Sequence, residues 1–173
     1  ETQTRRIIHD RARQSDAQDL RAETWRVRNR LEEEKASLRR SREVDIKFGE
    51  CGMLDVYFAM RYLQLRDDIP DDRDDRSSKF MLEQLLESGS LSADDFESLT
   101  RGYMFLIELD HNLRLAVGRT TTIPLGNEKA LETICERMKL SSAAALFERL
   151  SLHRLNIRAA FENIVSRLDA RDM

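Results

Sequence analysis

Apolar and polar residues follow a helical period in every long segment of the chain. In the last thirty or so residues the apolar positions recur at intervals of three and four, as expected for one face of a long α-helix. They are Leu146, Leu150, His153, Ile157, Phe161, Ile164 and Leu168. Residues 16–40 lack helix breakers and carry a thin apolar stripe among many charges, which predicts a long, mostly solvated helix. We find no alternating segment typical of a strand.

The segment from Met53 to Arg66 is different, because its apolar residues cover almost the whole helix circumference. A helix of this kind is normally central in its domain. Gly49 and Gly52 lie directly before it, which predicts a turn that side chains would obstruct. Residues 66–79 follow with Pro70 and six aspartates, a composition that predicts an exposed loop.

The next predicted helix runs to about residue 117 and has two apolar stripes. Ser92 is a good N-cap, and Asp94 and Asp95 suit the first turn. One stripe contains Leu99, Tyr103, Leu106, Leu113 and Val117, and the other contains Met104, Ile107, His111 and Leu115. Two stripes predict two packed faces, with His111 as a core histidine. After an irregular crossing with Pro124 and Gly126, a further helix is expected at about 128–138.

Composition agrees with a helical fold. The chain has 173 residues with 40% hydrophobic and 35% charged residues, but only 6 Gly and 2 Pro. This length suits one core. We therefore predict one all-α domain over 1–173, a helical bundle of about six helices with no sheet.

Charge and hydropathy narrow the class of partner. The formal net charge of -3 gives no field that would attract nucleic acid or an anionic membrane. No apolar run approaches a membrane span, and no signal peptide is visible. Cys51 and Cys135 stand far apart, which favours two reduced thiols and a cytoplasmic location. The chain begins at Glu1 in helix-like sequence, so we expect a piece of a longer protein.

The residues offer little catalytic chemistry of their own. The aspartate-rich loop lacks the spacing, glycine and terminal glutamate of a calcium loop, and the histidines and cysteines share no zinc spacing, so no metal site is predicted. The glycine turn is not a Walker loop, because Lys47 precedes the glycines. Free N–H groups at Gly49 and Gly52, with the charge of Lys47, would still favour an anion outside the turn.

Two blocks of the sequence resemble one enzyme family. "DIKFGECGMLDVYFAMRYLQL", from Asp45 to Leu65, resembles the D-I-K-x-G-x-G-G-x-x-D-I-E-F segment of bacterial glutamine synthetase adenylyltransferases. A second block is similar to the Y-x-F-L-R-x-x-E-H-R-L-Q and Q-T-x-x-L-P segments of that family. Its matching residues are Tyr103, Phe105, Leu106, Asp110, His111, Leu113, Thr120 and Pro124. The early "WRVRNRLEEE" is similar to the family's arginine-bearing helix, and the likeness covers about residues 19–168.

The resemblance implies the helical domain that follows a nucleotidyltransferase domain in enzymes that add AMP to, or remove it from, a tyrosine of glutamine synthetase. The preceding domain would carry the G-S and D-x-D residues for Mg²⁺ and ATP, which this chain lacks in usable form, so the fragment itself would be catalytically incomplete. Implied partners are that domain, glutamine synthetase and a PII-type regulator.

The resemblance also implies roles for individual residues, none of them catalytic. Four residues of the turn would lie near the nucleotide phosphates, and three of the second block would be structural or lie at an interface. The first group is Lys47, Gly49, Gly52 and Asp55, and the second is Asp110, His111 and Thr120.

Three departures from the family leave alternatives open. Cys51 replaces a glycine, Tyr57 a glutamate and Arg61 a glutamine. A tyrosine cannot act as a carboxylate, so a divergent or weakened enzyme is one reading. A non-catalytic module that binds a protein or links two catalytic halves is a second. A domain of a uridylyltransferase that modifies the PII protein is a third.

Overall fold

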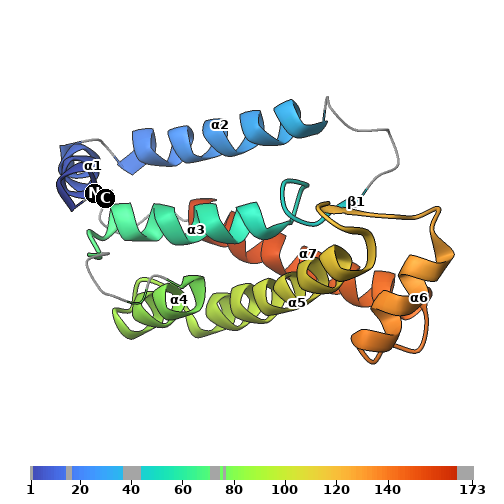
Figure 1. Cartoon of the computed structure of the whole chain (residues 1–173). Helices are drawn as coiled ribbons and strands as arrows, with labels where there is room; N and C mark the ends of the chain where they lie inside the picture. The colour runs from blue at the N-terminus through green and yellow to red at the C-terminus, as the bar shows by residue number, and fades with distance from the viewer. Residues whose placement is uncertain (1, 15–16, 37–43, 71–74, 76, 167–173) are drawn as a thin grey trace.

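A computed structural model describes the chain except residues 1, 15–16, 37–43, 71–74, 76 and 167–173. Figure 1 shows a layered bundle, with one long helix along one side of a central helix and a further layer on the other side. The helices are α1 (Thr2–Gln14), α2 (Ala17–Ala36), α3 (Met53–Arg66), α4 (Ser78–Glu87), α5 (Ala93–Val117), α6 (Glu128–Arg137) and α7 (Ala143–Ser166). Two short strands complete the described elements, β1 (Val44–Asp45) and β2 (Thr122–Ile123).

The central position predicted for α3 is confirmed. This helix contacts α1, α2, α4, α5 and α7, so nearly every face of it is covered. Val56, Ala59 and Leu63 are at most 1% exposed, as the circumferential apolar pattern predicts. Because α3 is central, the glycine turn at its N-terminus lies close to several other helices.

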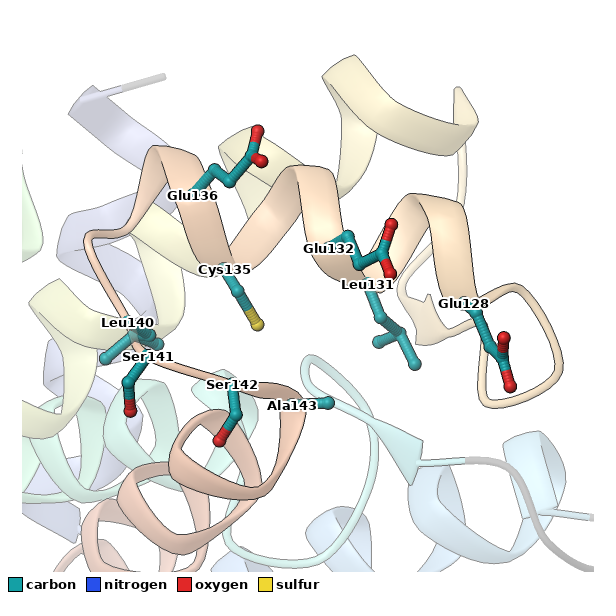
Figure 2. A pocket seen from close by; sticks show the side chains of 9 residues that line it. All are labelled: Glu128, Leu131, Glu132, Cys135, Glu136, Leu140, Ser141, Ser142 and Ala143. Carbon is teal, nitrogen blue, oxygen red and sulfur yellow. The ribbon is translucent and has the colours of Figure 1, made fainter.

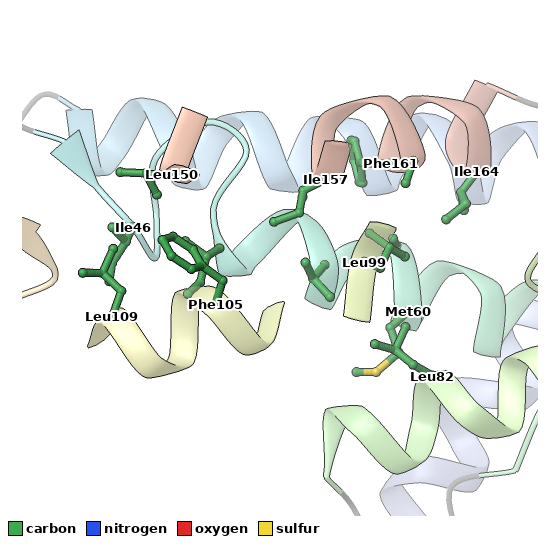
Figure 3. Close-up of a cluster of buried hydrophobic side chains, with 14 of the residues drawn as sticks. Ile46, Met60, Leu82, Leu99, Phe105, Leu109, Leu150, Ile157, Phe161 and Ile164 are labelled. Atoms are coloured by element: carbon green, nitrogen blue, oxygen red, sulfur yellow. The ribbon is translucent and has the colours of Figure 1, made fainter. Parts of the chain in front are cut away.

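The principal helix contact joins α5 to α7 and forms much of the core shown in Figure 3. A small residue is needed at Gly102, because a Cβ there would lie 2.6 Å from Cγ1 of Ile157. One turn further on, Phe105 stacks on His153 with ring centroids 4.6 Å apart. Leu99, Leu106 and Phe161 are fully buried nearby. The apolar stripe predicted for the last helix is therefore the face that packs on α5, with Leu168 outside the described residues.

Two details of the predicted fold were wrong. We predicted about six helices and no sheet, whereas seven helices and one antiparallel strand pair lie within the described residues. The additional helix α4 begins inside the segment predicted as a loop, where the Ser77 hydroxyl accepts the N–H of Phe80 and caps it. The strand pair joins Val44 to Ile123 and Asp45 to Thr122. Strands of two residues are too short to show an alternating pattern.

The second apolar stripe of α5 is largely exposed and lies outside the hydrophobic core of the described residues. Met104, Ile107 and Leu115 are 47%, 39% and 56% exposed, and His111 is exposed as well. The expectation of a second packed face, with His111 in the core, was therefore wrong. No helix in the described ranges has the length and apolar content needed to cross a membrane.

Candidate functional site around the glycine turn

Asp45 organises the turn that leads into α3. Its Oδ1 atom accepts the backbone N–H groups of Lys47 and Phe48 at 2.8 and 2.7 Å, which closes a local turn of the kind that aspartate favours. Its Oδ2 atom accepts the hydroxyl of Thr121 at 2.8 Å. The N–H of Ile46 donates to the carbonyl of Thr121 at 2.9 Å. The two sequence blocks that carry the family resemblance therefore meet at this point.

Gly52 is required by a close approach of the backbone. A Cβ atom at this position would lie 2.8 Å from the carbonyl oxygen of Ile46 and 2.9 Å from that of Gly49. Real Cβ atoms essentially never come so close to backbone atoms. The turn predicted from the glycines is thus confirmed at Gly52, where the reason is packing of backbone on backbone rather than a positive φ angle.

The N–H groups at the start of α3 are used inside the protein. Gly52 donates to the carbonyl of Gly49 at 3.1 Å, Met53 to that of Ile46 at 3.1 Å, and Leu54 to that of Lys47 at 3.1 Å. The prediction of a free, outward N–H at Gly52 was therefore wrong. An anion near this turn would have to be held by side chains from its rim and not by the helix N-terminus.

A buried ion pair lies beneath the turn and joins α2 to α3. Nε of Arg28 donates to Oδ1 of Asp55 at 2.5 Å, and the two side chains are 1% and 0% exposed. Oδ2 of Asp55 accepts the N–H of Cys51 at 2.8 Å, which ties the carboxylate to the turn. Glu32, one helical turn after Arg28, forms a second ion pair with the guanidinium. Asp55 therefore faces inward and fixes the turn on α2.

Cys51 has a backbone conformation that favours glycine. Its φ angle is 59°, in the left-handed region where a Cβ atom is strained. A glycine would adopt this conformation without that strain. Burial, reinforced by the charges of Asp55 and Glu50, raises the pKa of the Cys51 thiol to about 11. The thiol is consequently protonated at neutral pH and is a poor nucleophile.

Basic side chains surround the outer side of the turn. Nζ of Lys47 lies 5.5 Å from the centre of the Phe48 ring, and Nζ of Lys35 lies 5.0 Å from the same ring. Arg154 of α7 donates through Nε to the carbonyl of Glu50 at 3.1 Å. Lys47 is half-buried and has no ion pair to any described carboxylate. A cation held against an aromatic ring beside a fixed turn is suited to contact an anion.

The three candidates of the second block play different parts. Thr120 accepts the N–H of Thr122 through its hydroxyl at 3.0 Å and so shapes the loop before β2. Asp110 is half-buried and pairs with Arg114 at 2.9 Å on α5. His111 is exposed on the second apolar stripe of that helix. Among the described residues, none of the three forms a hydrogen bond or ion pair with the turn, whereas the neighbouring residue Thr121 does.

The described side chains around the turn do not form a metal site. Among the described residues, no group of three or more His, Cys, Asp or Glu side chains could hold a metal ion. Of the carboxylates at the turn, Asp55 is already paired with Arg28, and Asp45 already accepts the N–H groups of Lys47 and Phe48. The described donor set does not fit Mg²⁺, and we derive no metal-dependent step for this chain.

Sequence reasoning missed Arg28, Asp45, Thr121 and Arg154 as parts of this site. One signal could have found the ion pair. Arg28 follows Leu20 and Thr24 on the buried side of α2, and Asp55 interrupts the otherwise apolar circumference of α3. Opposite charges at two buried positions predict a pair, because a buried charge needs a partner. The contact of Thr121 with Asp45 spans 76 residues and has no local signal.

Comparison with known proteins shows the family to which the chain belongs. The family described as GlnD PII-uridylyltransferase has a model that matches residues 17–165 of the chain. The chain belongs to this family. The matched range is close to the 19–168 expected from the resemblance as a whole.

Curated relatives are named bifunctional glutamine synthetase adenylyltransferase/adenylyl-removing enzyme. The protein from Corynebacterium diphtheriae is 38% identical over 89 residues, covering 48% of this chain and 8% of the relative. That from Mycolicibacterium smegmatis is 36% identical over 113 residues, covering 64% and 11%. That from Corynebacterium glutamicum is 28% identical over 164 residues, covering 90% and 15%. The chain thus spans only a small part of these relatives, consistent with further domains beside it.

Proposed function

We propose that this chain is the helical domain of a glutamine synthetase adenylyltransferase and that it presents its glycine turn to a neighbouring nucleotidyltransferase domain. The names of the relatives support the general function. The single structural observation behind the role of the turn is its rigid attachment. Asp45, Asp55 and Arg154 hold it from three directions, while the amine of Lys47 has no ion-pair partner among the described residues.

The parent reaction sets what such a turn could contribute. A tyrosine hydroxyl of glutamine synthetase loses its proton and attacks the α-phosphorus of ATP, while the bond to pyrophosphate breaks. In the removal direction, inorganic phosphate attacks the same phosphorus and the tyrosine leaves. Negative charge on the phosphate oxygens rises along either path. We assign Lys47 to the stabilisation of this charge, because electrostatic groups held in place contribute most when they need not reorganise.

The metal carboxylates and most of the ATP contacts would belong to the neighbouring domain. The fold of this chain would then act as the support that sets the position of Lys47. The same proposal gives the fragment no activity alone. Purified fragment should transfer no AMP from ATP to glutamine synthetase, and a robust Mg²⁺-dependent transfer would refute it.

The family description favours a second candidate, a domain of a uridylyltransferase that modifies PII. One assay separates the two. The gene product that contains this chain is incubated with glutamine synthetase or with PII, using ATP or UTP labelled at the α-phosphate. We expect label from ATP on glutamine synthetase. Label from UTP on PII alone would identify the second candidate, and no transfer to either protein would favour the non-catalytic module.

A further inference from the structure

A groove between α6 and the beginning of α7 lies outside the glycine turn. It encloses about 470 Å³ and is lined along its floor by Leu131 and Cys135 of α6, with Leu140 and Ala143 on the opposite side. Leu131 and Cys135 are 7% and 5% exposed, so the floor is part of the packed structure. Figure 2 shows the sulfur of Cys135 directed into the space between α6 and the segment that leads into α7. The thiol has no hydrogen bond among the described residues.

Three glutamates form the rim of the groove on α6. Glu128, Glu132 and Glu136 follow one another at intervals of four residues, so their side chains leave the same side of the helix. All three are exposed. Like charges at this spacing destabilise a helix. Glu128 lies in the first turn of α6, where the helix dipole favours a negative charge, but Glu132 and Glu136 lie beyond that turn.

The row also lacks the compensation seen on other helices. Elsewhere, several exposed carboxylates pair with a base four residues away, as in Glu97 with Arg101 at 2.8 Å and Glu162 with Arg158 at 2.5 Å. Within the described ranges, none of the three rim glutamates has an ion pair. The groove thus combines an apolar floor with a negative rim whose charge is unbalanced.

This combination selects one kind of occupant. A metal ion is disfavoured, because among the described residues no group of three or more His, Cys, Asp or Glu side chains could hold one. An anion is opposed by the rim, and the N–H groups of Ala145 and Leu146 at the start of α7 already donate to Ser142. A basic amphipathic helix fits both features, since lysines or arginines one turn apart match the spacing of the rim and an apolar side chain fills the floor.

We propose that the groove between α6 and α7 docks a basic amphipathic helix of a partner protein. The apolar floor supplies burial, and the three rim glutamates supply orientation through charge complementarity. This interaction surface is separate from the glycine turn and does not depend on the adenylyltransferase assignment. It therefore stands or falls on its own binding measurement.

The test uses the whole 173-residue chain and fluorescent peptides of about 18 residues, or five helical turns. One peptide is amphipathic with lysines at four-residue intervals, a second replaces every lysine by glutamate, and a third has the first composition in an order without an apolar face. Fluorescence anisotropy gives the affinities, and amide chemical shifts of the chain locate the binding. We expect only the first peptide to bind well, with the largest shifts at 128–143.

A triple variant tests the rim directly. Glu128→Gln, Glu132→Gln and Glu136→Gln together remove three exposed charge pairs from the complex, so the affinity should fall about tenfold. The same variant should fold at least as well as the parent, because like-charge repulsion within α6 is removed. Raising the ionic strength should weaken the parent complex more than the variant complex.

The matched control changes the net charge equally at other exposed sites. It carries Glu87→Gln, Glu108→Gln and Glu148→Gln, and its affinity for the basic peptide should stay within about twofold of the parent. Failure of the basic amphipathic peptide to bind would overturn the proposal. Equal losses of affinity in the two triple variants would also overturn it, as would a glutamate peptide that binds as tightly as the lysine peptide. Amide chemical-shift changes centred outside the groove would do the same.

Discussion

Asp55→Asn removes one charge from the buried ion pair beneath the glycine turn. The asparagine is nearly the same size and can still accept the N–H of Cys51 through its amide oxygen. In that orientation its NH₂ group faces the guanidinium of Arg28, which is 1% exposed, so the carboxylate oxygen that accepted from Arg28 is lost. The substitution therefore tests the charge while leaving the packing volume unchanged.

The structure sets the expected magnitude. Breaking a buried ion pair by removing one partner typically costs about 3–5 kcal/mol, because the other charge stays buried without compensation. Arg28 still has Glu32, whose side chain is 28% exposed and therefore a weaker partner in water. We expect a loss near the lower end, about 3 kcal/mol in the free energy of unfolding.

Urea unfolding followed by circular dichroism measures this loss. The control is Glu97→Gln, which breaks an exposed pair whose side chains are 73% and 55% exposed. It should change the free energy by less than about 1 kcal/mol. A double variant, Arg28→Met with Asp55→Asn, removes both charges of the α2–α3 pair and should be more stable than Asp55→Asn alone.

Two outcomes would refute the reasoning. If Asp55→Asn costs no more than the exposed control, the ion pair does not hold α2 to α3. If the double variant is less stable than the single one, an unpaired buried guanidinium is not the source of the loss.

Three further predictions concern the turn and the α5–α7 contact. Gly52→Ala should lose about 1–3 kcal/mol by forcing the backbone apart, whereas Gly126→Ala, which meets nothing within 4 Å, should be near neutral in the same unfolding assay. The Cys51→Gly variant should have a free energy of unfolding about 1 kcal/mol higher than that of the Cys51→Ala variant, because the φ angle at this position is 59°. Equal free energies of unfolding for the two variants would argue against backbone strain there. Burial, with the charges of Arg149 and Arg101, lowers the pKa of His153 below 6.5, so the folded state binds fewer protons than the unfolded state. Stability should therefore fall as pH decreases through about 6.5, and His153→Gln should flatten that dependence in unfolding curves measured from about pH 8 to about pH 5.

The parts of the fold that were predictable are those with a strong local pattern. Met53 begins the helix α3, whose apolar residues cover nearly the whole helix circumference. Ser92 caps α5 by accepting the N–H of Asp95 at 3.2 Å, as the sequence predicts. Periodicity does not reveal what covers a face. Met104 and Leu115 are apolar at the right spacing, yet both are exposed and lie outside the hydrophobic core of the described residues. The short pairing of β1 with β2 depends on contacts between distant segments and has no local pattern.

The candidate site was predictable to a similar extent. The glycines marked the turn, and Gly52 is essential for a reason of the predicted kind. The direction of Asp55 was not predictable, because a carboxylate at the start of a helix can face solvent or the core, and only the position of Arg28 decides this. The sequence does not show that the N–H groups at the start of α3 already have partners. Their acceptors, such as the carbonyl of Ile46, lie in the turn, and the path of the turn is not visible in the sequence.

The role proposed for the turn depends most directly on Lys47. The measurement is kcat for AMP transfer to glutamine synthetase by the gene product that contains this chain, together with its unfolding midpoint, for the parent, Lys47→Ala and the remote control Lys79→Ala. Lys47→Ala should lower kcat by about a hundredfold while changing stability by no more than about 0.5 kcal/mol, and Lys79→Ala should change neither. An unchanged kcat, or a loss of kcat matched by an equal loss of folded protein, would contradict the placement of the glycine turn beside the transferred nucleotide.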